Sequence, residues 1–304
     1  MHIAHFSDLH VLSLEGVGAM RFMNKRLSGL ANLRFKRSHA HRTSYVRAVA
    51  KEIARVRADH VVVTGDLTNL ALEQEFLAAR TLLEEELHLT PDHVSIVPGN
   101  HDFYTRGALR GRRFTEYFRQ YVKCDLDVAV DIGSGHFPFV RLRGPCAFIG
   151  LSSAVPRVPF VAAGNLGKPQ LAALRRALAH PEVKKRLPVL LVHHPMHNPP
   201  SRLKTYVEGL RDADALIDAL RDVPRGLVLH GHLHDRVWRS LKTTSGEVFA
   251  IGATSASLHH EAETRMSGFN LYEVDDATGA IRNVEAHVFD PGTETFHVEE
   301  IVRR

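Results

Sequence analysis

Two patterns of hydrophobic and polar positions alternate along the first 234 residues. Short continuous runs of Val, Ile and Leu, bounded by turn residues, indicate buried strands. These runs cover residues 3–6, 61–64, 94–97, 146–151, 189–192 and 227–230. Between them, apolar residues recur every three or four positions and predict helices at 43–58, 70–88, 168–179 and 212–221. Alternating strands and helices predict an α/β fold.

The pattern changes after residue 234. Shorter strands are predicted at 236–241, 248–251, 270–274 and 284–289, with Gly and Asp turns between them. They favour a second, largely antiparallel sheet. The sequence shows no internal repeat, low-complexity tract or long linker, so we expect one domain over residues 1–304.

The composition excludes several classes of protein. The chain is 44% hydrophobic and can bury a large core. Its two cysteines form no CxxC pair, which argues against a disulfide framework or a thiolate metal site. No apolar run reaches the ~18 residues of a membrane span, and the first predicted strand begins too early for a signal peptide. We therefore expect a cytoplasmic protein.

Polar side chains follow five of the predicted strands at the point where each strand ends. The exits read SDLH (7–10), TGD (64–66), PGNHD (98–102), HHP (193–195) and GHLH (231–234). In open α/β sheets, ligands bind at the carboxyl ends of the strands. Side chains two positions apart in an extended segment point the same way, so Asp-x-His and His-x-His can each act as a clamp. Carboxylate, amide and imidazole groups suit Mn, Fe, Zn or Co, so the exits indicate a metal site.

The ordered series D-x-H, G-D, G-N-H-D, H-H-P, G-H-x-H, from residue 8 to residue 234, resembles the calcineurin-like metallophosphoesterases. The resemblance implies a two-sheet β-sandwich flanked by helices and a centre of two metal ions, with Mn and Fe favoured. The nucleophile would be a hydroxide bridging the ions, in line with the leaving group. The ligand set would be Asp8, His10, Asp66 and His234 for one ion, and the bridging Asp66 with Asn100, His193 and His232 for the other.

The resemblance also assigns groups beside the metals. His101 would protonate the leaving group, with Asp102 orienting its ring, although Asp102 could instead be a simple turn residue. His194 is expected to contact substrate, with metal ligation as the alternative. Arg106 opens a basic and aromatic segment after GNHD and is expected to bind substrate.

Residues 12–42 form a basic insertion between the first two blocks. Residues 16–50 contain eight Lys and Arg residues and no acid. An apolar stripe inside the insertion predicts a helix: Met20, Met23, Leu27 and Leu30. Two interpretations stay open. The helix packs its stripe on the body of the protein, or it forms a cap whose arginines bind phosphate or an anionic membrane surface.

The activity favoured by the sequence is a metal-dependent phosphodiesterase, similar to the cyclic-nucleotide and glycerophosphodiester phosphodiesterases. The alternative resembles the UDP-2,3-diacylglucosamine hydrolases, which cleave a pyrophosphate at the membrane surface; residues 16–50 would then contact the inner membrane. The substrate is thus a small phosphate ester or a phospholipid-like molecule. A nuclease is a weaker candidate because the positive charge is confined to one segment. A non-catalytic scaffold would have lost ligands that this chain keeps.

Overall fold

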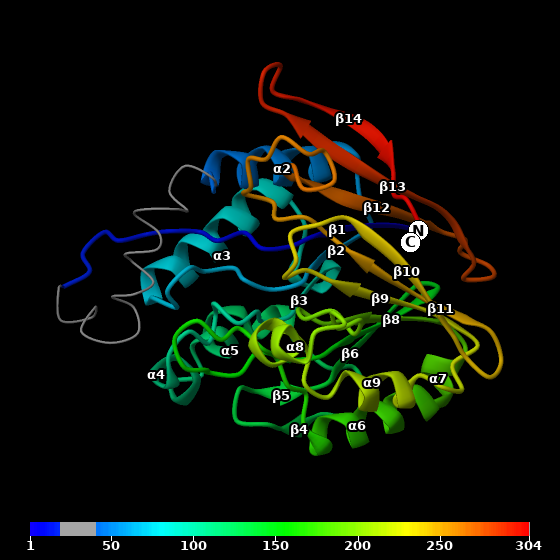
Figure 1. Ribbon diagram of the computed structural model, residues 1–304. Helices are drawn as coiled ribbons and strands as arrows, with labels where there is room; N and C mark the ends of the chain where they lie inside the picture. Colours follow the sequence, from blue (N-terminus) through cyan, green and yellow to red (C-terminus); the bar gives the residue numbers. More distant parts are fainter. Residues whose placement is uncertain (19–40, 304) are drawn as a thin grey trace.

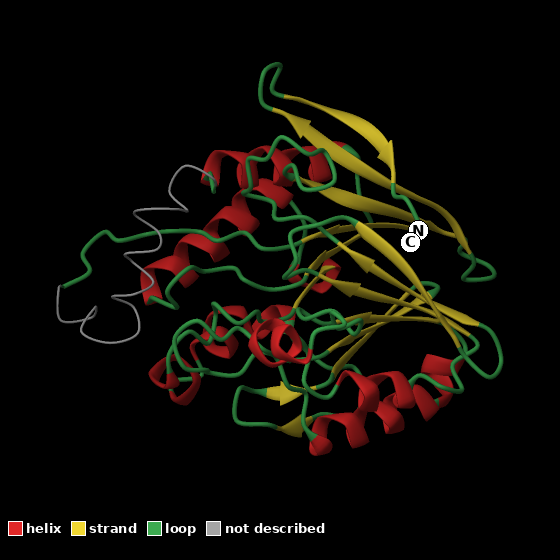
Figure 2. Ribbon diagram, in the orientation of Figure 1, coloured by secondary structure: helices red, strands yellow, loops and turns green. Residues whose placement is uncertain are grey.

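The computed structural model describes residues 1–18 and 41–303 (Figure 1). Two six-stranded β-sheets pack against each other, and helices cover the outer faces (Figure 2). The helices α2 (Thr43–Arg55) and α3 (Glu73–Leu87) cover one sheet, whereas α6 (Lys168–Ala179), α7 (Pro181–Lys184) and α9 (Ala213–Ala219) lie on the side of the other. The expected two-sheet sandwich flanked by helices is confirmed.

Each sheet combines strands from distant parts of the chain. The first has the order β14-β13-β12-β1-β2-β3 and the second β10-β11-β9-β8-β7-β6. The first sheet consists of β1 (His2–Phe6), β2 (His60–Val63), β3 (Val94–Ile96), β12 (Gly268–Val274), β13 (Ile281–Asp290) and β14 (Thr295–Glu300). The second consists of β6 (Phe139–Arg143), β7 (Cys146–Gly150), β8 (Leu187–Leu191), β9 (Arg225–His230), β10 (Val237–Lys242) and β11 (Glu247–Gly252). A small hairpin joins β4 (Val130–Asp131) to β5 (His136–Phe137).

The prediction of a separate antiparallel sheet after residue 234 is wrong. The strands themselves are present, but β10 and β11 extend the second sheet, where β11 runs parallel to β9. In contrast, β12 to β14 extend the first sheet, with β12 antiparallel to β1. An alternating pattern shows that a strand has a buried face, but it does not identify the neighbouring strand.

The long predicted helices are confirmed as α2, α3, α6 and α9. In α2 the buried side chains recur at helical spacing: Tyr45, Val46, Val49, Ala50 and Ile53. Four shorter helices were not predicted: α4 (Arg106–Arg110), α5 (Arg113–Phe118), α7 and α8 (Arg202–Glu208). At four to seven residues they are too short to show a periodic pattern.

Parallel pairing brings the strand exits together. The strands β1, β2 and β3 are mutually parallel, as are β7, β8, β9 and β11. Their carboxyl ends therefore meet at one edge of the sandwich. The predicted helical insertion at 12–42 lies mostly outside the described residues, which include only its two ends. No helix in the described part of the chain is long and apolar enough to cross a membrane.

Candidate metal centre

The seven predicted ligands lie together at this edge. One group surrounds the exit of β1, where the Nε2 atoms of His10 and His234 are 3.3 Å apart. The Nε2 atom of His234 is also 3.0 Å from Asp8 Oδ1. Asp66 Oδ2, from the exit of β2, lies 4.0 Å from His10 Nε2. Two imidazoles and two carboxylates thus converge from three strands.

A second group lies on the other side of Asp66. The Nε2 atom of His193 is 3.4 Å from Asp66 Oδ2 and 3.1 Å from Asn100 Oδ1. The Nδ1 atom of His232 is also 3.1 Å from Asn100 Oδ1. Asp66 therefore contacts both groups, which is the position expected of a bridging ligand.

The backbone at these exits is held in an unusual conformation. Five of the seven predicted ligands have left-handed φ angles: Asp8 (53°), His10 (46°), Asp66 (49°), His232 (70°) and His234 (51°). Such residues cost on the order of 1 kcal/mol or more each and are concentrated at functional sites. Close packing also requires two glycines, since a Cβ on Gly65 would lie 2.6 Å from the amide nitrogen of Gly99. These backbone conformations direct the ligand side chains toward one another.

The protonation pattern of the site fits a bound cation. The Nδ1 atom of His193 lies 2.7 Å from the carbonyl oxygen of Thr64, so this nitrogen donates and Nε2 directs a lone pair at Asp66 and Asn100. The Nε2 atom of His232 lies 2.8 Å from Glu208 O and leaves a lone pair on Nδ1 in the same way. Lone pairs that face carboxylate and amide oxygens repel each other unless a cation lies between them.

The electrostatics agree with this interpretation. Burial alone would lower the pKa of His193, but the Asp66 carboxylate, followed by Asp8, raises it to about 9. Burial would raise the pKa of Asp66, yet His193 and His101 hold it well below its usual range. The Asp66 and Asp8 carboxylates thus favour positive charge at the position of the His193 ring.

Comparison with known proteins agrees with the geometry. The sequence profile described as calcineurin-like phosphoesterase matches residues 1–236. The chain belongs to the calcineurin-like phosphoesterase family. It is therefore a metallophosphoesterase, of a family that uses a dinuclear metal centre. Among curated proteins, no sequence matches this phosphoesterase significantly.

Solved structures share the fold at low sequence identity. A dimetal phosphatase from Danio rerio is 17% identical, with 90% of this chain and 92% of that chain covered and a TM-score of 0.55. A purple acid phosphatase from yellow lupin seeds is 12% identical, with 98% and 52% covered and a TM-score of 0.58. The sulfate thiohydrolase SoxB from Thermus thermophilus is 18% identical, with 94% and 55% covered and a TM-score of 0.50.

In the phosphoesterase structure, Asp102 does not have the contact expected of it. The Nδ1 atom of His101 lies 2.7 Å from the carbonyl oxygen of Asn69, so this carbonyl orients the ring. The buried Asp102 carboxylate instead accepts hydrogen bonds from the loop after β2 and from Gly99. The prediction that Asp102 orients His101 is wrong, because its oxygens are directed at backbone amides. Burial and the Asp66 carboxylate raise the pKa of Asp102 to about 7.

The two expected substrate-binding residues differ in exposure. His194 is fully buried, with Nδ1 2.8 Å from Ser153 Oγ and Nε2 2.7 Å from Ala162 O. Both ring nitrogens are thus engaged by the protein, and burial holds the pKa of His194 well below its usual range. Contact with substrate remains a prediction, and in this conformation the ring acts as part of the wall behind His193 and His232.

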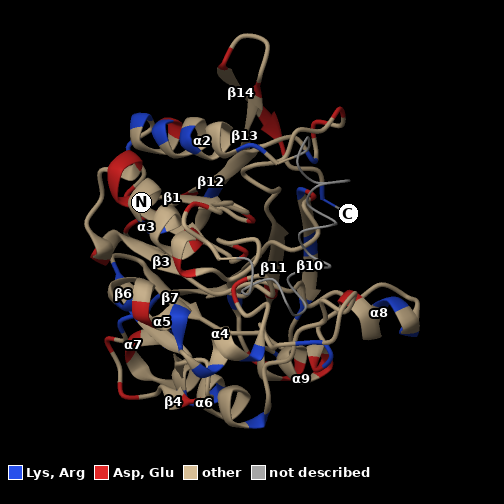
Figure 3. Ribbon diagram, turned by 90° about the vertical axis from the view of Figure 1, so that its left-hand side faces the viewer, with Lys and Arg blue, Asp and Glu red and all other residues tan. Residues whose placement is uncertain are grey.

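Arg106 is exposed at the start of α4, in a region rich in Lys and Arg positions (Figure 3). Two neighbours are already paired, since Arg112 contacts Asp131 and Arg113 contacts Glu73. Among the described residues, Arg106 makes no ion pair. Its role in binding an anionic group of the substrate stays a prediction.

One residue near the ligands was not predicted. The His41 ring lies 4.7 Å from that of His10 and 5.6 Å from that of His234, measured between centroids. A signal was present in the sequence, because His39 and His41 repeat the His-x-His spacing of residues 232–234. This His-x-His pair does not follow a predicted strand, so it was not among the strand ends expected to supply ligands.

Proposed function

We propose that this phosphoesterase hydrolyses a phosphodiester with two metal ions held by the seven converging side chains. Asp8, His10, Asp66 and His234 would bind one ion, and Asp66, Asn100, His193 and His232 the other. The convergence of lone pairs on either side of Asp66 is the observation that supports this ligand set. When bound, the ions would neutralise charge on the phosphoryl group and activate the attacking water.

His101 is proposed as the proton donor to the leaving group. Its Nδ1–H donates to Asn69 O, so Nε2 is the nitrogen that would carry the transferable proton. The ring stacks on Tyr104 with a centroid distance of 5.5 Å and meets the ring of His10 edge to face at 5.0 Å. These contacts hold the ring beside the proposed metal ligands, where it would donate a proton and not bind a metal ion.

The exposed guanidinium of Arg106 is proposed to bind the phosphate or another anionic part of the substrate. We also propose that residues 1–304 form one domain with residues 12–42 as a cap, because both described ends of the insertion adjoin the site. A diester is favoured because the series of motifs and its spacing resemble those of cyclic-nucleotide and glycerophosphodiester phosphodiesterases.

A lipid-like pyrophosphate is the second candidate, and it has structural support of its own. Leu233, between two predicted ligands, is 41% exposed, and Leu12 and Leu14, two and four positions after His10, are each 40% exposed. Exposed apolar side chains beside a polar centre suit an amphiphilic substrate better than a cyclic nucleotide.

The experiment compares two substrates with the Mn-loaded protein: 3′,5′-cAMP and UDP-2,3-diacylglucosamine in detergent micelles. Asp66→Ala serves as the blank. Turnover of cAMP supports the phosphodiesterase, whereas turnover of the lipid alone supports the second candidate. Equal turnover by Asp66→Ala and the unaltered protein would overturn the proposed metal centre.

A further inference from the structure

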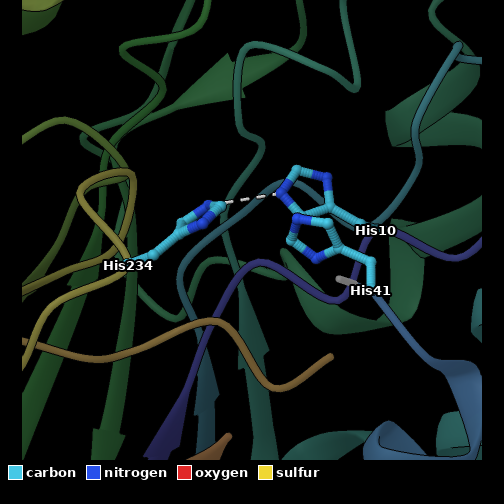
Figure 4. A group of neighbouring side chains, drawn as sticks. All are labelled: His10, His41 and His234. Atoms are coloured by element: carbon cyan, nitrogen blue, oxygen red, sulfur yellow. Dashed lines mark hydrogen bonds between the residues drawn. The ribbon is translucent and has the colours of Figure 1, made fainter. Parts of the chain in front are cut away.

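His41 adds a third imidazole to the group formed by His10 and His234 (Figure 4). One ring nitrogen of each of the three lies within 4.8 Å of the other two. Whereas His10 and His234 follow strands, His41 belongs to the carboxyl-terminal end of the insertion at 12–42. The insertion therefore reaches the metal site through a residue that none of the family motifs contains.

The backbone of His41 is anchored against the loop after β11. It forms an antiparallel bridge with Leu258, and the adjacent Arg42 donates its amide to Ser257 O at 2.8 Å. This pairing places His41 beside Ser257 irrespective of its side chain. The position of the ring is thus defined by backbone contacts that do not depend on a metal.

A serine network favours one tautomer of His41. Its Nδ1 lies 2.7 Å from Ser257 Oγ. The Ser257 hydroxyl in turn lies 3.3 Å from the carbonyl oxygen of Asp8 and 3.1 Å from Ser255 Oγ, either of which can accept its proton. When Ser257 donates its proton to one of these oxygens, it accepts Nδ1–H from His41, and the lone pair of the neutral ring is on Nε2. A hydrogen bond from the other ring nitrogen is the usual arrangement around metal-ligating histidines.

We propose that His41 ligates, through Nε2, the metal ion held by Asp8, His10 and His234. The inference rests on the proposed function, since it assumes that this ion is bound. Three imidazoles whose nitrogens converge are stabilised by a shared cation, because lone pairs at such distances otherwise repel. The insertion then supplies a ligand of its own, and metal binding fixes its carboxyl-terminal end at the site.

The test is metal affinity rather than turnover. Zn²⁺ binding is measured by competition with a chromophoric chelator for the unaltered full-length chain, His41→Ala and His259→Ala. His259 is the matched control, because it lies in the loop paired with His41 but its Nδ1 contacts the Tyr45 hydroxyl, 3.2 Å away. We expect His41→Ala to lose about tenfold or more in affinity for one of two ions, since even residues behind a ligand contribute that much. His259→Ala should match the unaltered protein.

A second measurement observes the His41 ring directly in the unaltered protein, and uses the variant only to assign its signal. In ¹⁵N-histidine-labelled protein, Zn²⁺ should shift the Nε2 resonance of His41, assigned by its absence from the His41→Ala spectrum. Two ions bound with unchanged affinity in His41→Ala, together with an unshifted His41 resonance, would overturn the proposal while leaving the metal centre intact. Failure of the unaltered protein to bind any ion would instead overturn the proposed function, and the inference with it.

Discussion

Substitution of Asp102 distinguishes a structural role for this residue from a catalytic one. Its buried carboxylate accepts hydrogen bonds from Gly99 N (2.9 Å), Thr68 N (3.0 Å), Thr68 Oγ1 (3.0 Å) and Leu67 N (3.3 Å). Asp102→Ala leaves three buried backbone donors without an acceptor, at about 1–3 kcal/mol each. Because the longest bond contributes least, we expect a loss of about 3–6 kcal/mol from the free energy of unfolding. That loss is a large part of the roughly 5–15 kcal/mol by which a folded domain is typically stable.

The assay is urea unfolding of the metal-free protein, so that changes in metal binding do not contribute. The m-value should stay constant if only stability changes. His101→Ala is the neighbouring control, and loss of the side-chain hydrogen bond to Asn69 O should cost about 1 kcal/mol. If Asp102→Ala unfolds within about 1 kcal/mol of the unaltered protein and only turnover of poor leaving groups falls, the structural reasoning is refuted.

Four further outcomes are expected. Asp66→Ala should reduce bound metal, measured by plasma mass spectrometry, from two ions to at most one and abolish hydrolysis; retention of both ions would contradict its bridging position. His101→Ala should keep both ions but slow turnover about 10²–10⁴-fold, more for alkyl than for p-nitrophenyl leaving groups, and an equal loss for both would argue against proton donation. The pKa of His193 is raised to about 9, so metal binding at pH 8 should release a proton from this residue. In calorimetry the heat of metal binding should then vary with the ionisation enthalpy of the buffer. A heat that does not depend on the buffer would contradict the raised pKa. Burial lowers the pKa of His5 to about 3, so below pH 6.5 only the unfolded chain takes up a proton at this residue and the free energy of unfolding falls as the pH decreases. Between pH 7 and pH 5 the free energy of unfolding should therefore fall by about 2 kcal/mol less in His5→Gln than in the unaltered protein. An equal fall in both proteins would refute the lowered pKa of His5.

The ligand residues could be predicted from the sequence because each one follows the end of a predicted strand. A buried strand is recognisable from its apolar run, and the polar residues that follow it are adjacent in the chain. Parallel strands of one sandwich place those residues at one edge, so Asp8, Asp66, Asn100, His193 and His232 could be expected together before their distances were known. Their proximity in the structure follows from parallel strand pairing within each sheet and from the packing of the two sheets against each other.

Only the tertiary structure assigned the residues that act across distant segments. In the structure the Asp102 carboxylate binds the loop after β2 and does not bind His101, because hydrogen bonds depend on which donors lie within about 3 Å in space. The structure placed His41 beside His234, which lies far along the chain, through backbone pairing with the loop around Leu258. It also divided the last five strands between two sheets. Strand patterns and ligand motifs are local and can be read from the chain, whereas partners are chosen by packing between segments far apart in sequence.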